Sequence, residues 1–255
     1  YHPPGRFVDR SLVFLNAAQE CLGVLPAASL PDSPQSVISH PGSTAGGIIF
    51  RSRAGLREVL SLLEAAVLFY AGLGIESLEF RLAEPLASWP TDGELPYLLW
   101  HRGFVLLSRE ISHGVPLQSG PVWEEFGRSR NISYLRSAKK NGLVIRKHER
   151  ADAIYPLIEA NLGSRYDKKP THSLQELNCL IELYPDRITC WAVEHEGRAI
   201  AATVVFAVNK RCVHTFYITQ DYGCSNLHPM PFLYYALYET YRDMGFFWFN
   251  FGLSS

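Results

Sequence analysis

The stretch that decides the fold runs from residue 187 to residue 220 and reads RITCWAVEHEGRAIAATVVFAVNKRCVHTFYITQ. Three apolar runs rich in β-branched and aromatic residues follow one another, and the polar turn His195-Glu196-Gly197 separates the first two. Such runs bounded by turn residues are typical of buried strands. The stretch therefore predicts a β-hairpin followed by a third strand.

The segment after this stretch predicts a loop, a helix and a further strand. Residues 222–229 (YGCSNLHP) contain glycine, serine, asparagine and proline, which are typical of loops. Apolar residues then recur at a spacing of three to four, which is typical of one helix face, at Phe232, Tyr235, Leu237, Tyr238 and Tyr241. Gly245 stands where a helix C-cap is expected, directly before the aromatic run 246–252.

The same order of elements occurs earlier in the chain. Residues 10–29 predict a hairpin, 36–40 a third strand, 41–47 a loop, 56–70 a helix, and 77–83 a strand that follows Gly74. Six matching elements in one order indicate a tandem repeat. We therefore expect residues 10–83 to superpose on residues 187–252.

The region between the copies predicts the elements that separate the two units. A short helix over 95–101 and a strand over 104–111 are expected to close the first sheet, followed by a loop with His113, Gly114, Pro116 and Gly120. We place the boundary near Gly120, giving units 1–120 and 121–255. The second unit then opens with a helix over 122–141, a strand over 143–148, and helices over 151–164 and 173–183, the last with a capping box.

The two copies differ at their ends. Nothing before residue 10 corresponds to the strand and helices over 143–183, and nothing after residue 252 corresponds to the closing helix and strand over 95–111. The first unit is therefore expected to be incomplete at its N-terminal end and the second at its C-terminal end. An unpaired sheet edge is expected there.

This order resembles that of the GNAT acyltransferase superfamily, and four segments resemble the Fem-type family of tandem GNAT-like proteins more closely: 23–26 (GVLP), 39–47 (SHPGSTAGG), 130–146 (RNISYLRSAKKNGLVIR) and 249–252 (FNFG). That family includes the aminoacyltransferases of peptidoglycan cross-bridges. The resemblance implies an α/β (α+β) fold of two tandem GNAT-like units, each a mixed, mostly antiparallel sheet flanked by helices. It also implies acyl or aminoacyl transfer to an amine or hydroxyl of a cell-envelope saccharide or peptide precursor.

One departure concerns the acyl donor. GNAT enzymes that use acetyl-CoA carry an R/Q-x-x-G-x-G/A loop whose backbone N–H groups hold the pyrophosphate. Here residues 221–231 read DYGCSNLHPMP, with Gly223 as the single glycine and with Pro229 and Pro231 lacking N–H groups. The donor is therefore left open among acyl-CoA, acyl carrier protein and aminoacyl-tRNA, as a co-substrate rather than a tightly bound cofactor. A nucleotide-sugar, polysaccharide or peptide is the expected acceptor.

The resemblance implies a catalytic site in the second unit, where the third hairpin strand and the next strand splay apart. Tyr217, Asp221 and Tyr222 are expected at the mouth of this gap, with Asp221 as a base and either tyrosine as an acid. His214 has the opposite strand parity to Tyr217, so only one of them is expected to face the gap. The alternatives are a packing role for Tyr217, a core role for His214 and a turn role for Asp221.

Two further groups are candidates for substrate binding. In the first unit, His40, Ser43 and Thr44 belong to a loop that suits a polar acceptor, although its glycines equally suit a tight turn. In the second unit, residues 128–150 hold eight Lys or Arg and one acid. The exposed helix side predicted for this run, with Arg136, Lys139 and Lys140, suits a nucleotide-sugar diphosphate or tRNA, and Arg165 and Tyr166 belong to a candidate lid. The alternative is a solvated surface.

Composition limits the remaining classes of function. The 255 residues are 47% hydrophobic and carry a net charge of −1, which favours a globular protein without a global attraction to polyanions. Five cysteines without a C-x-x-C pair indicate free thiols in a reducing, cytoplasmic location. No metal-ligand spacing and no apolar run long enough for a membrane span are present. We expect a monomer or homodimer, and a non-catalytic GNAT-like binding module is the rival interpretation.

Overall fold

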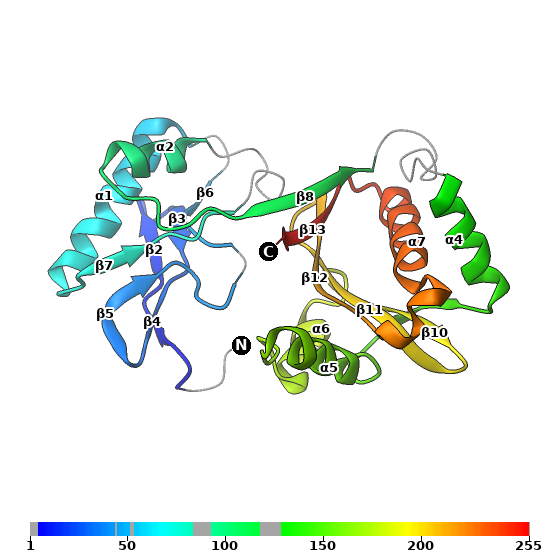
Figure 1. Ribbon diagram of the computed structural model, residues 1–255. Helices are drawn as coiled ribbons and strands as arrows, with labels where there is room; N and C mark the ends of the chain where they lie inside the picture. The colour runs from blue at the N-terminus through cyan, green and yellow to red at the C-terminus, as the bar shows by residue number, and fades with distance from the viewer. Residues whose placement is uncertain (1–4, 44, 52–53, 84–92, 118–128, 255) are drawn as a thin grey trace. The chain divides into compact units, whose positions relative to one another are not determined.

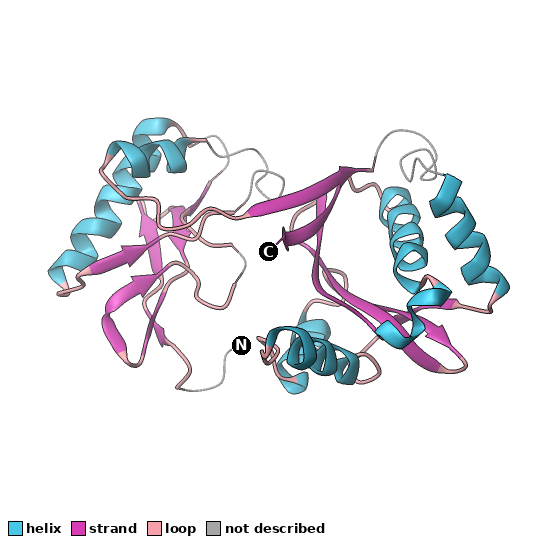
Figure 2. Ribbon diagram, in the orientation of Figure 1, coloured by secondary structure: helices cyan, strands magenta, loops and turns pink. Residues whose placement is uncertain are grey.

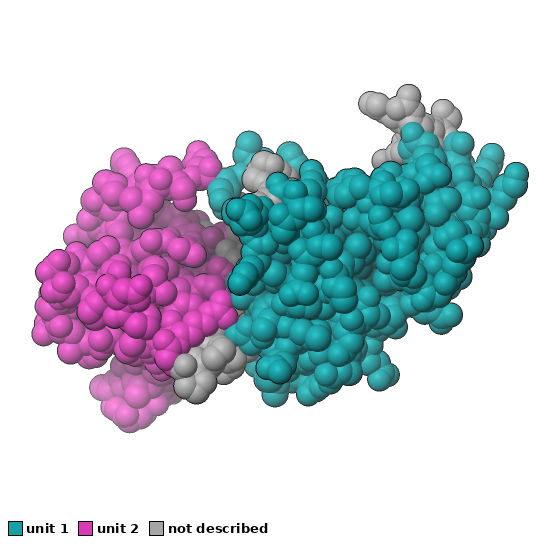
Figure 3. Space-filling model, turned by 60° about the horizontal axis from the view of Figure 1, so that its bottom comes forward, with its two compact units in different colours: residues 1, 110–255 teal, residues 2–109 magenta. Residues whose placement is uncertain are grey.

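The computed structural model describes residues 5–43, 45–51, 54–83, 93–117 and 129–254. The chain forms two compact units that divide between Arg109 and Glu110 (Figure 3). We call residues 2–109 the N-terminal unit and residues 110–255 the C-terminal unit. Gly120, near which the boundary was predicted, lies outside the described residues.

The C-terminal unit is built on a six-stranded sheet of order β8-β13-β12-β11-β10-β9 (Figures 1 and 2). Its strands are β8 (Ile111–Pro116), β9 (Val144–His148), β10 (Ile188–His195), β11 (Arg198–Ala207), β12 (Cys212–Gln220) and β13 (Trp248–Ser254). Neighbouring strands are antiparallel except β12 and β13, which run parallel. The hairpin and third strand predicted from residues 187–220 are confirmed as β10, β11 and β12.

Helices cover both faces of this sheet because its strands are apolar on both sides. The helices α4 (Ser129–Lys140) and α7 (Pro229–Asp243) pack on the face that carries Val193 and Val213. The opposite face, with Ala192 and Val204, is covered by α5 (Tyr155–Tyr166) and α6 (Leu174–Leu183). The predicted capping box of α6 is confirmed, since Ser173 and Glu176 bond each other's backbone N–H groups.

The N-terminal unit holds a four-stranded sheet of order β1-β4-β5-β7 and a three-stranded sheet of order β2-β3-β6. Its elements are β1 (Val8–Asp9), β2 (Leu12–Leu15), β3 (Cys21–Leu25), β4 (Ala28–Leu30), β5 (Ser33–Ile38), β6 (Ile49–Phe50), α1 (Leu56–Gly72), β7 (Ser77–Glu79) and α2 (Glu94–His101). Pro26, which has no N–H group, lies where β3 ends before β4. The strands β5 and β7 are parallel, as β12 and β13 are.

Two expectations about the region between the units are wrong. Residues 104–110 form no strand, and β8 begins only at Ile111 and pairs with β13 in the C-terminal unit rather than closing the first sheet. The outer edge of β13 is therefore paired, contrary to the open edge expected there. An apolar run such as 104–107 does not reveal its pairing partner, and Val105, Leu106 and Leu107 are in fact exposed.

The predicted tandem repeat stays a prediction, because the N-terminal unit distributes its strands over two sheets whereas β10, β11, β12 and β13 share one. Gly74 and Gly245 both adopt the positive φ of a helix C-cap glycine, at 74° and 85°. Superposition of residues 10–83 on 187–252 stays a prediction. Within the described ranges, no helix has the length and apolar character needed to cross a bilayer.

Candidate functional site

The two parallel strands of the C-terminal unit separate after three residue pairs. Cys212, Val213 and His214 pair with Trp248, Phe249 and Asn250, and no further β12–β13 pair is formed among the described residues. The strand β12 continues to Gln220, whereas β13 kinks between Asn250 and Leu253 and follows β8. We call this opening the divergence. Backbone N–H groups on the β12 side of such a gap are available to a bound carbonyl oxygen.

A β-bulge corrects the parity predicted for His214 and Tyr217. Val205 pairs with Thr215 and Val204 pairs with Tyr217, so Phe216 is the extra residue on β12. Tyr217 therefore faces the same side as Val204, and His214 the same side as its partner Phe206. Both candidates lie on the α5/α6 face, so the opposite parity predicted for His214 and Tyr217 is wrong.

Tyr217 lies in the packed interior beside His172. Its hydroxyl accepts a hydrogen bond from the His172 backbone N–H at 3.1 Å and lies 3.1 Å from the Nδ1 atom of that histidine. Only 7% of Tyr217 is exposed, and burial raises the pKa of its hydroxyl. These contacts fit the packing alternative for Tyr217 better than a role as a proton donor.

His214 lies at the apex of the divergence and is also buried. Its ring closely approaches Gly252, where a Cβ atom would lie 3.2 Å from the His214 Cε1 atom and 3.1 Å from the Thr215 carbonyl oxygen. Gly252 has a φ of 81°, a left-handed conformation that favours glycine. The glycine therefore permits both the kink of β13 and the close approach of the histidine.

Asp221 fixes the turn that follows β12. Its carboxylate accepts a hydrogen bond from the Gly223 N–H at 2.9 Å, as the N-cap of the 3₁₀ helix η1 (Tyr222–Leu227), and pairs with the Arg198 guanidinium at 2.9 Å. The Gly223 hydrogen bond and then the Arg198 contact lower the pKa of Asp221. A carboxylate with a lowered pKa is a weak base, so this arrangement favours the turn role.

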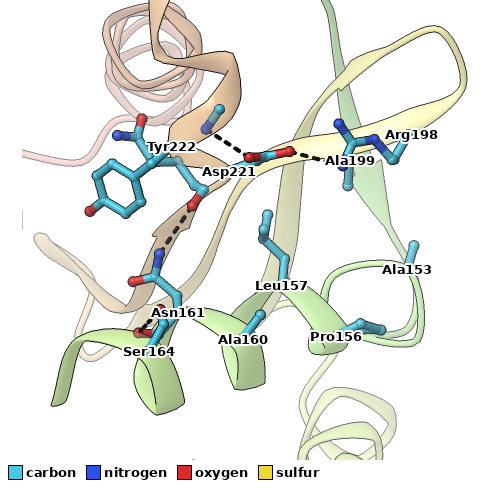
Figure 4. A pocket seen from close by; sticks show the side chains of 12 residues that line it. Ala153, Pro156, Leu157, Ala160, Asn161, Ser164, Arg198, Ala199, Asp221 and Tyr222 are labelled. Carbon is cyan, nitrogen blue, oxygen red and sulfur yellow. Dashed lines mark hydrogen bonds and ion pairs between the residues drawn. The ribbon is translucent and has the colours of Figure 1, made fainter. Parts of the chain in front are cut away.

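A pocket of about 640 Å³ lies beside this turn (Figure 4). Its polar rim includes Arg198, Asp221, Tyr222 and Asn161, whose amide donates to the Gln220 carbonyl oxygen at 3.0 Å. Its apolar part comes mostly from α5 and is formed by Ala153, Pro156, Leu157, Ala160 and Ala199. The pocket thus combines a small apolar surface with an anchored ion pair.

Two of the predicted residues, Tyr222 and Arg165, meet beside the pocket. The Arg165 guanidinium donates to the Tyr222 hydroxyl and lies 5.0 Å from the centre of its ring. The side chain of Tyr166 lies outside the described residues. The structure therefore brings together Asp221, Tyr222 and Arg165, while His214 and Tyr217 lie farther back along β12.

The remaining candidates lie elsewhere. Arg136, Lys139 and Lys140 are exposed on α4, which covers the sheet face opposite α5 and α6. His40 and Ser43 belong to the N-terminal unit, and the Ser43 hydroxyl donates to the Ala45 carbonyl oxygen at 2.9 Å. Thr44 lies outside the described residues.

The turn between β12 and α7 differs from a phosphate cradle. The N–H groups of Gly223, Cys224 and His228 bond oxygens of Asp221 and Ser225 within the turn, and α7 begins at Pro229. The sequence-based expectation that this turn lacks the usual pyrophosphate donors is consistent with these bonds. In the described part of the chain, no cluster of three His, Cys, Asp or Glu side chains suits a metal ion.

Sequence reasoning missed three residues that shape this region: Arg198, His172 and Asn250. Arg198 is the first residue of β11 and His172 stands in the loop before α6, and no periodicity marks either position. Asn250 belongs to the segment FNFG that carried the resemblance. A polar side chain in an otherwise aromatic strand could have marked it as a candidate.

Comparison with known proteins supports the resemblance. Residues 128–255 match the model of the acetyltransferase (GNAT) domain family. No curated protein sequence matches the chain. Among solved structures, FemX is similar with a TM-score of 0.68 at 12% identity, covering 97% of this chain and 80% of FemX.

Two further structures share the fold. L-PGS from Bacillus licheniformis has a TM-score of 0.62 at 10% identity, over 96% of this chain and 71% of its own. A tandem GNAT protein from the clavulanic acid biosynthesis pathway has a TM-score of 0.54 at 13% identity, over 98% of this chain and 75% of its own. These likenesses confirm the predicted fold class, and with its C-terminal half matched by the family model, the chain belongs to the acetyltransferase (GNAT) domain family.

Proposed function

We propose that the C-terminal unit transfers an acyl or aminoacyl group to an amine or hydroxyl of a cell-envelope saccharide or peptide precursor in the cytoplasm. The observation that carries this proposal is the divergence of β12 and β13 after three residue pairs. Among the described residues, it leaves the edge of β12 beyond His214 without a strand partner, although β12 lies in the interior of the sheet. The four segments that resemble the Fem-type family support the class of acceptor.

The reaction is direct acyl transfer at the divergence. The lone pair of the acceptor nitrogen or oxygen forms a bond to the acyl carbon, and the carbonyl oxygen takes up the negative charge. Backbone N–H groups of β12 stabilise this oxyanion, an effect worth about 3 kcal/mol for one well-placed donor. The bond from the acyl carbon to the donor then breaks, its electron pair leaves with the donor, and the acceptor proton is lost.

We assign transfer of the acceptor proton to His214. Among the four residues predicted as catalytic, it is the one at the last β12–β13 pair. Asp221 is held as an ionised carboxylate by Gly223 and Arg198, and Tyr217 is bonded to His172. Histidine is also the side chain that most often serves as a general acid or base in enzymes.

We further propose that the donor is an aminoacyl-tRNA rather than acyl-CoA or acyl carrier protein. Two observations favour it: the β12–α7 turn uses its N–H groups internally, and Arg136, Lys139 and Lys140 form an exposed basic surface on α4. In the described residues these three side chains make no ion pair, so their charge is available to a polyanion.

A donor assay tests the proposal. The chain is incubated with a cell-envelope precursor, such as a nucleotide-linked muropeptide, and with bulk tRNA charged with ¹⁴C-amino acids or with ¹⁴C-acetyl-CoA. We expect label on the acceptor from aminoacyl-tRNA and a fall of about 100-fold in kcat for His214→Gln. No labelled product from either donor, with the acceptor still bound, would support the rival binding module.

Charge reversal tests the basic surface separately. Arg136→Glu, Lys139→Glu and Lys140→Glu together are expected to weaken binding of charged tRNA and to reduce its dependence on salt, because fewer phosphate contacts release fewer counterions. Lys210→Glu, an exposed turn residue, is the matched control. Equal tRNA affinity of the triple variant and the wild type at low salt would exclude this surface.

A further inference from the structure

The side chain of Asn250 is held in one orientation at the apex of the divergence. Its Oδ1 atom accepts hydrogen bonds from the Gly252 N–H at 2.7 Å and from the Ser112 hydroxyl at 2.8 Å. Exchanging the oxygen and the NH₂ group would bring two donors together at Gly252. The amide nitrogen is therefore fixed on the remaining side.

That nitrogen is a buried donor that lacks an acceptor in the described part of the chain. Asn250 is 0% exposed, and its Nδ2 atom has no hydrogen-bond partner among the described residues. Buried polar groups are nearly always paired, so an unpaired one calls for a specific explanation. The two bonds at Oδ1 explain the kink of β13, but they leave the NH₂ group unexplained.

The surroundings place this donor among groups that suit acyl transfer. Asn250 pairs with His214 on β12 and with Gly114 on β8, and paired residues of neighbouring strands face the same side of a sheet. The buried imidazole therefore lies on one side of the amide. On the other side Gly114 contributes no side chain. The position is also the last one at which β12 and β13 are joined.

We infer that the Asn250 amide donates a hydrogen bond to the carbonyl oxygen of the transferred acyl group. The acyl group reaches this donor by separating β12 and β13 at their last pair, and so supplies the missing acceptor. As the acceptor nucleophile bonds to the acyl carbon and the bond to the donor breaks, charge on that oxygen rises and then falls. The hydrogen bond from Asn250 is therefore strongest after the nucleophile has bonded and before the bond to the donor breaks. This inference rests on the proposed function.

The test uses two buried Asn→Asp substitutions in the full chain. Asn250→Asp keeps the oxygen that Gly252 and Ser112 bond but removes the amide donor. Asn178→Asp is the matched control, because Asn178 is 4% exposed and both atoms of its amide are paired, with Ala151 and Asp152. Both variants are assayed with bulk ¹⁴C-aminoacyl-tRNA and ¹⁴C-acetyl-CoA, beside the wild type.

We expect Asn250→Asp to lower kcat about 100-fold with KM changed less than about threefold, since the contact is made mainly in the transition state. Asn178→Asp should keep kcat within about twofold although it also lowers thermal stability. Wild-type kcat in Asn250→Asp would overturn the inference and leave the proposed function standing. A wild-type chain that transfers neither label would instead overturn the proposed function.

A binding measurement covers the case in which Asn250→Asp does not fold. In wild-type protein labelled with ¹⁵N-asparagine, addition of puromycin, a stable aminoacyl nucleoside, should shift the Asn250 side-chain amide resonance downfield as it gains an acceptor. Asn250→Ser identifies that resonance by its loss. An unshifted Asn250 resonance, with other signals showing that puromycin binds, would overturn the inference.

Discussion

The parallel strand pairs of the two units begin alike and end differently. In the N-terminal unit, β5 and β7 pair over three residues and then stay joined: the Ser39 N–H donates to the Glu79 carbonyl oxygen at 2.8 Å, and the Arg81 N–H donates to the Ser39 hydroxyl at 2.9 Å. Gly46 then returns to bridge Leu82. In the C-terminal unit, β12 and β13 separate after the same number of pairs.

The difference lies in the loop that leaves the first strand of each pair. The N-terminal loop folds back along β7, so the chain itself occupies the edge that a ligand needs. In the C-terminal unit Asp221 caps η1 and directs the chain into α7 instead. The comparison indicates that the loop after the first strand decides whether a parallel strand pair is closed or open, and it favours the C-terminal unit for catalysis.

The largest expected effect on stability comes from a substitution that disrupts the closed β5–β7 pair. A Cβ atom at Gly46 would lie 2.4 Å from the Ser39 carbonyl oxygen, a contact that the backbone must relieve. We expect Gly46→Ala to lower the free energy of unfolding by about 3 kcal/mol. Gly72→Ala in α1, where a Cβ meets nothing within 4 Å, should be neutral or slightly stabilising. Urea unfolding of both variants measures these free energies. Equal stability of the two variants would contradict the close packing of Gly46 against Ser39.

A smaller effect is expected at the open pair. In Gly252→Ala, the alanine must adopt the left-handed φ of Gly252 at the kink of β13. Its Cβ would lie 3.1 Å from the Thr215 carbonyl oxygen. We expect a loss of about 2 kcal/mol, of which about 1 kcal/mol is backbone strain. Gly245→Ala has the same strain and no close contact, so it isolates the backbone part. If urea unfolding shows equal losses of unfolding free energy in the two variants, the close approach at Gly252 contributes nothing to stability.

A substitution at Tyr217 tests whether this side chain packs the core beside the β12–β13 pair or takes part in catalysis. Tyr217→Phe removes the hydroxyl that His172 contacts and leaves the ring in place. We expect a loss of about 1 kcal/mol in the free energy of unfolding and an unchanged kcat. The double variant with Thr219→Val, which loses a separate bond to the Leu157 carbonyl oxygen, should show additive losses. A kcat reduced tenfold or more in Tyr217→Phe would restore its predicted catalytic role.

Much of the fold follows from sequence patterns because its elements are local. Residues 187–220 specify β10 to β12, and glycines with positive φ end α1 and α7. The pairing of β8 with β13 joins residues far apart in sequence, and no period in the chain encodes it. The strand predicted over 104–111 failed for that reason.

The candidate site was less predictable because single residues decide it. One extra residue, Phe216, changes the face of every side chain that follows it, so counting parity from His214 to Tyr217 gave the wrong result. Asp221 was correctly placed at the end of β12, but its contacts with Gly223 and Arg198 depend on the fold. Neither a bulge nor an orphaned amide such as that of Asn250 has a signature in one sequence.

The smallest expected effect concerns Asp221, whose turn directs the chain away from the open pair. Asp221→Asn keeps an oxygen that can accept from the Gly223 N–H but removes the ion pair with Arg198, which is 65% exposed. Exposed pairs contribute about 0.5 kcal/mol. We therefore expect a small loss of stability at pH 7 and a kcat within about twofold of the wild type.

The pH dependence gives the sign of this contribution. Because the folded-state pKa of Asp221 lies below its ordinary value of 3.8, the ionised carboxylate stabilises the fold above that value, and the contribution is lost as pH falls through the folded-state pKa. The stability difference between Asp221→Asn and the wild type should therefore shrink below about pH 4, as thermal unfolding between pH 7 and pH 3 will show. Asp152→Asn, which loses a comparable surface pair with Arg150, is the control. A kcat that falls 100-fold in Asp221→Asn, with loss of the acidic limb of the pH–rate profile, would make Asp221 the base and displace His214.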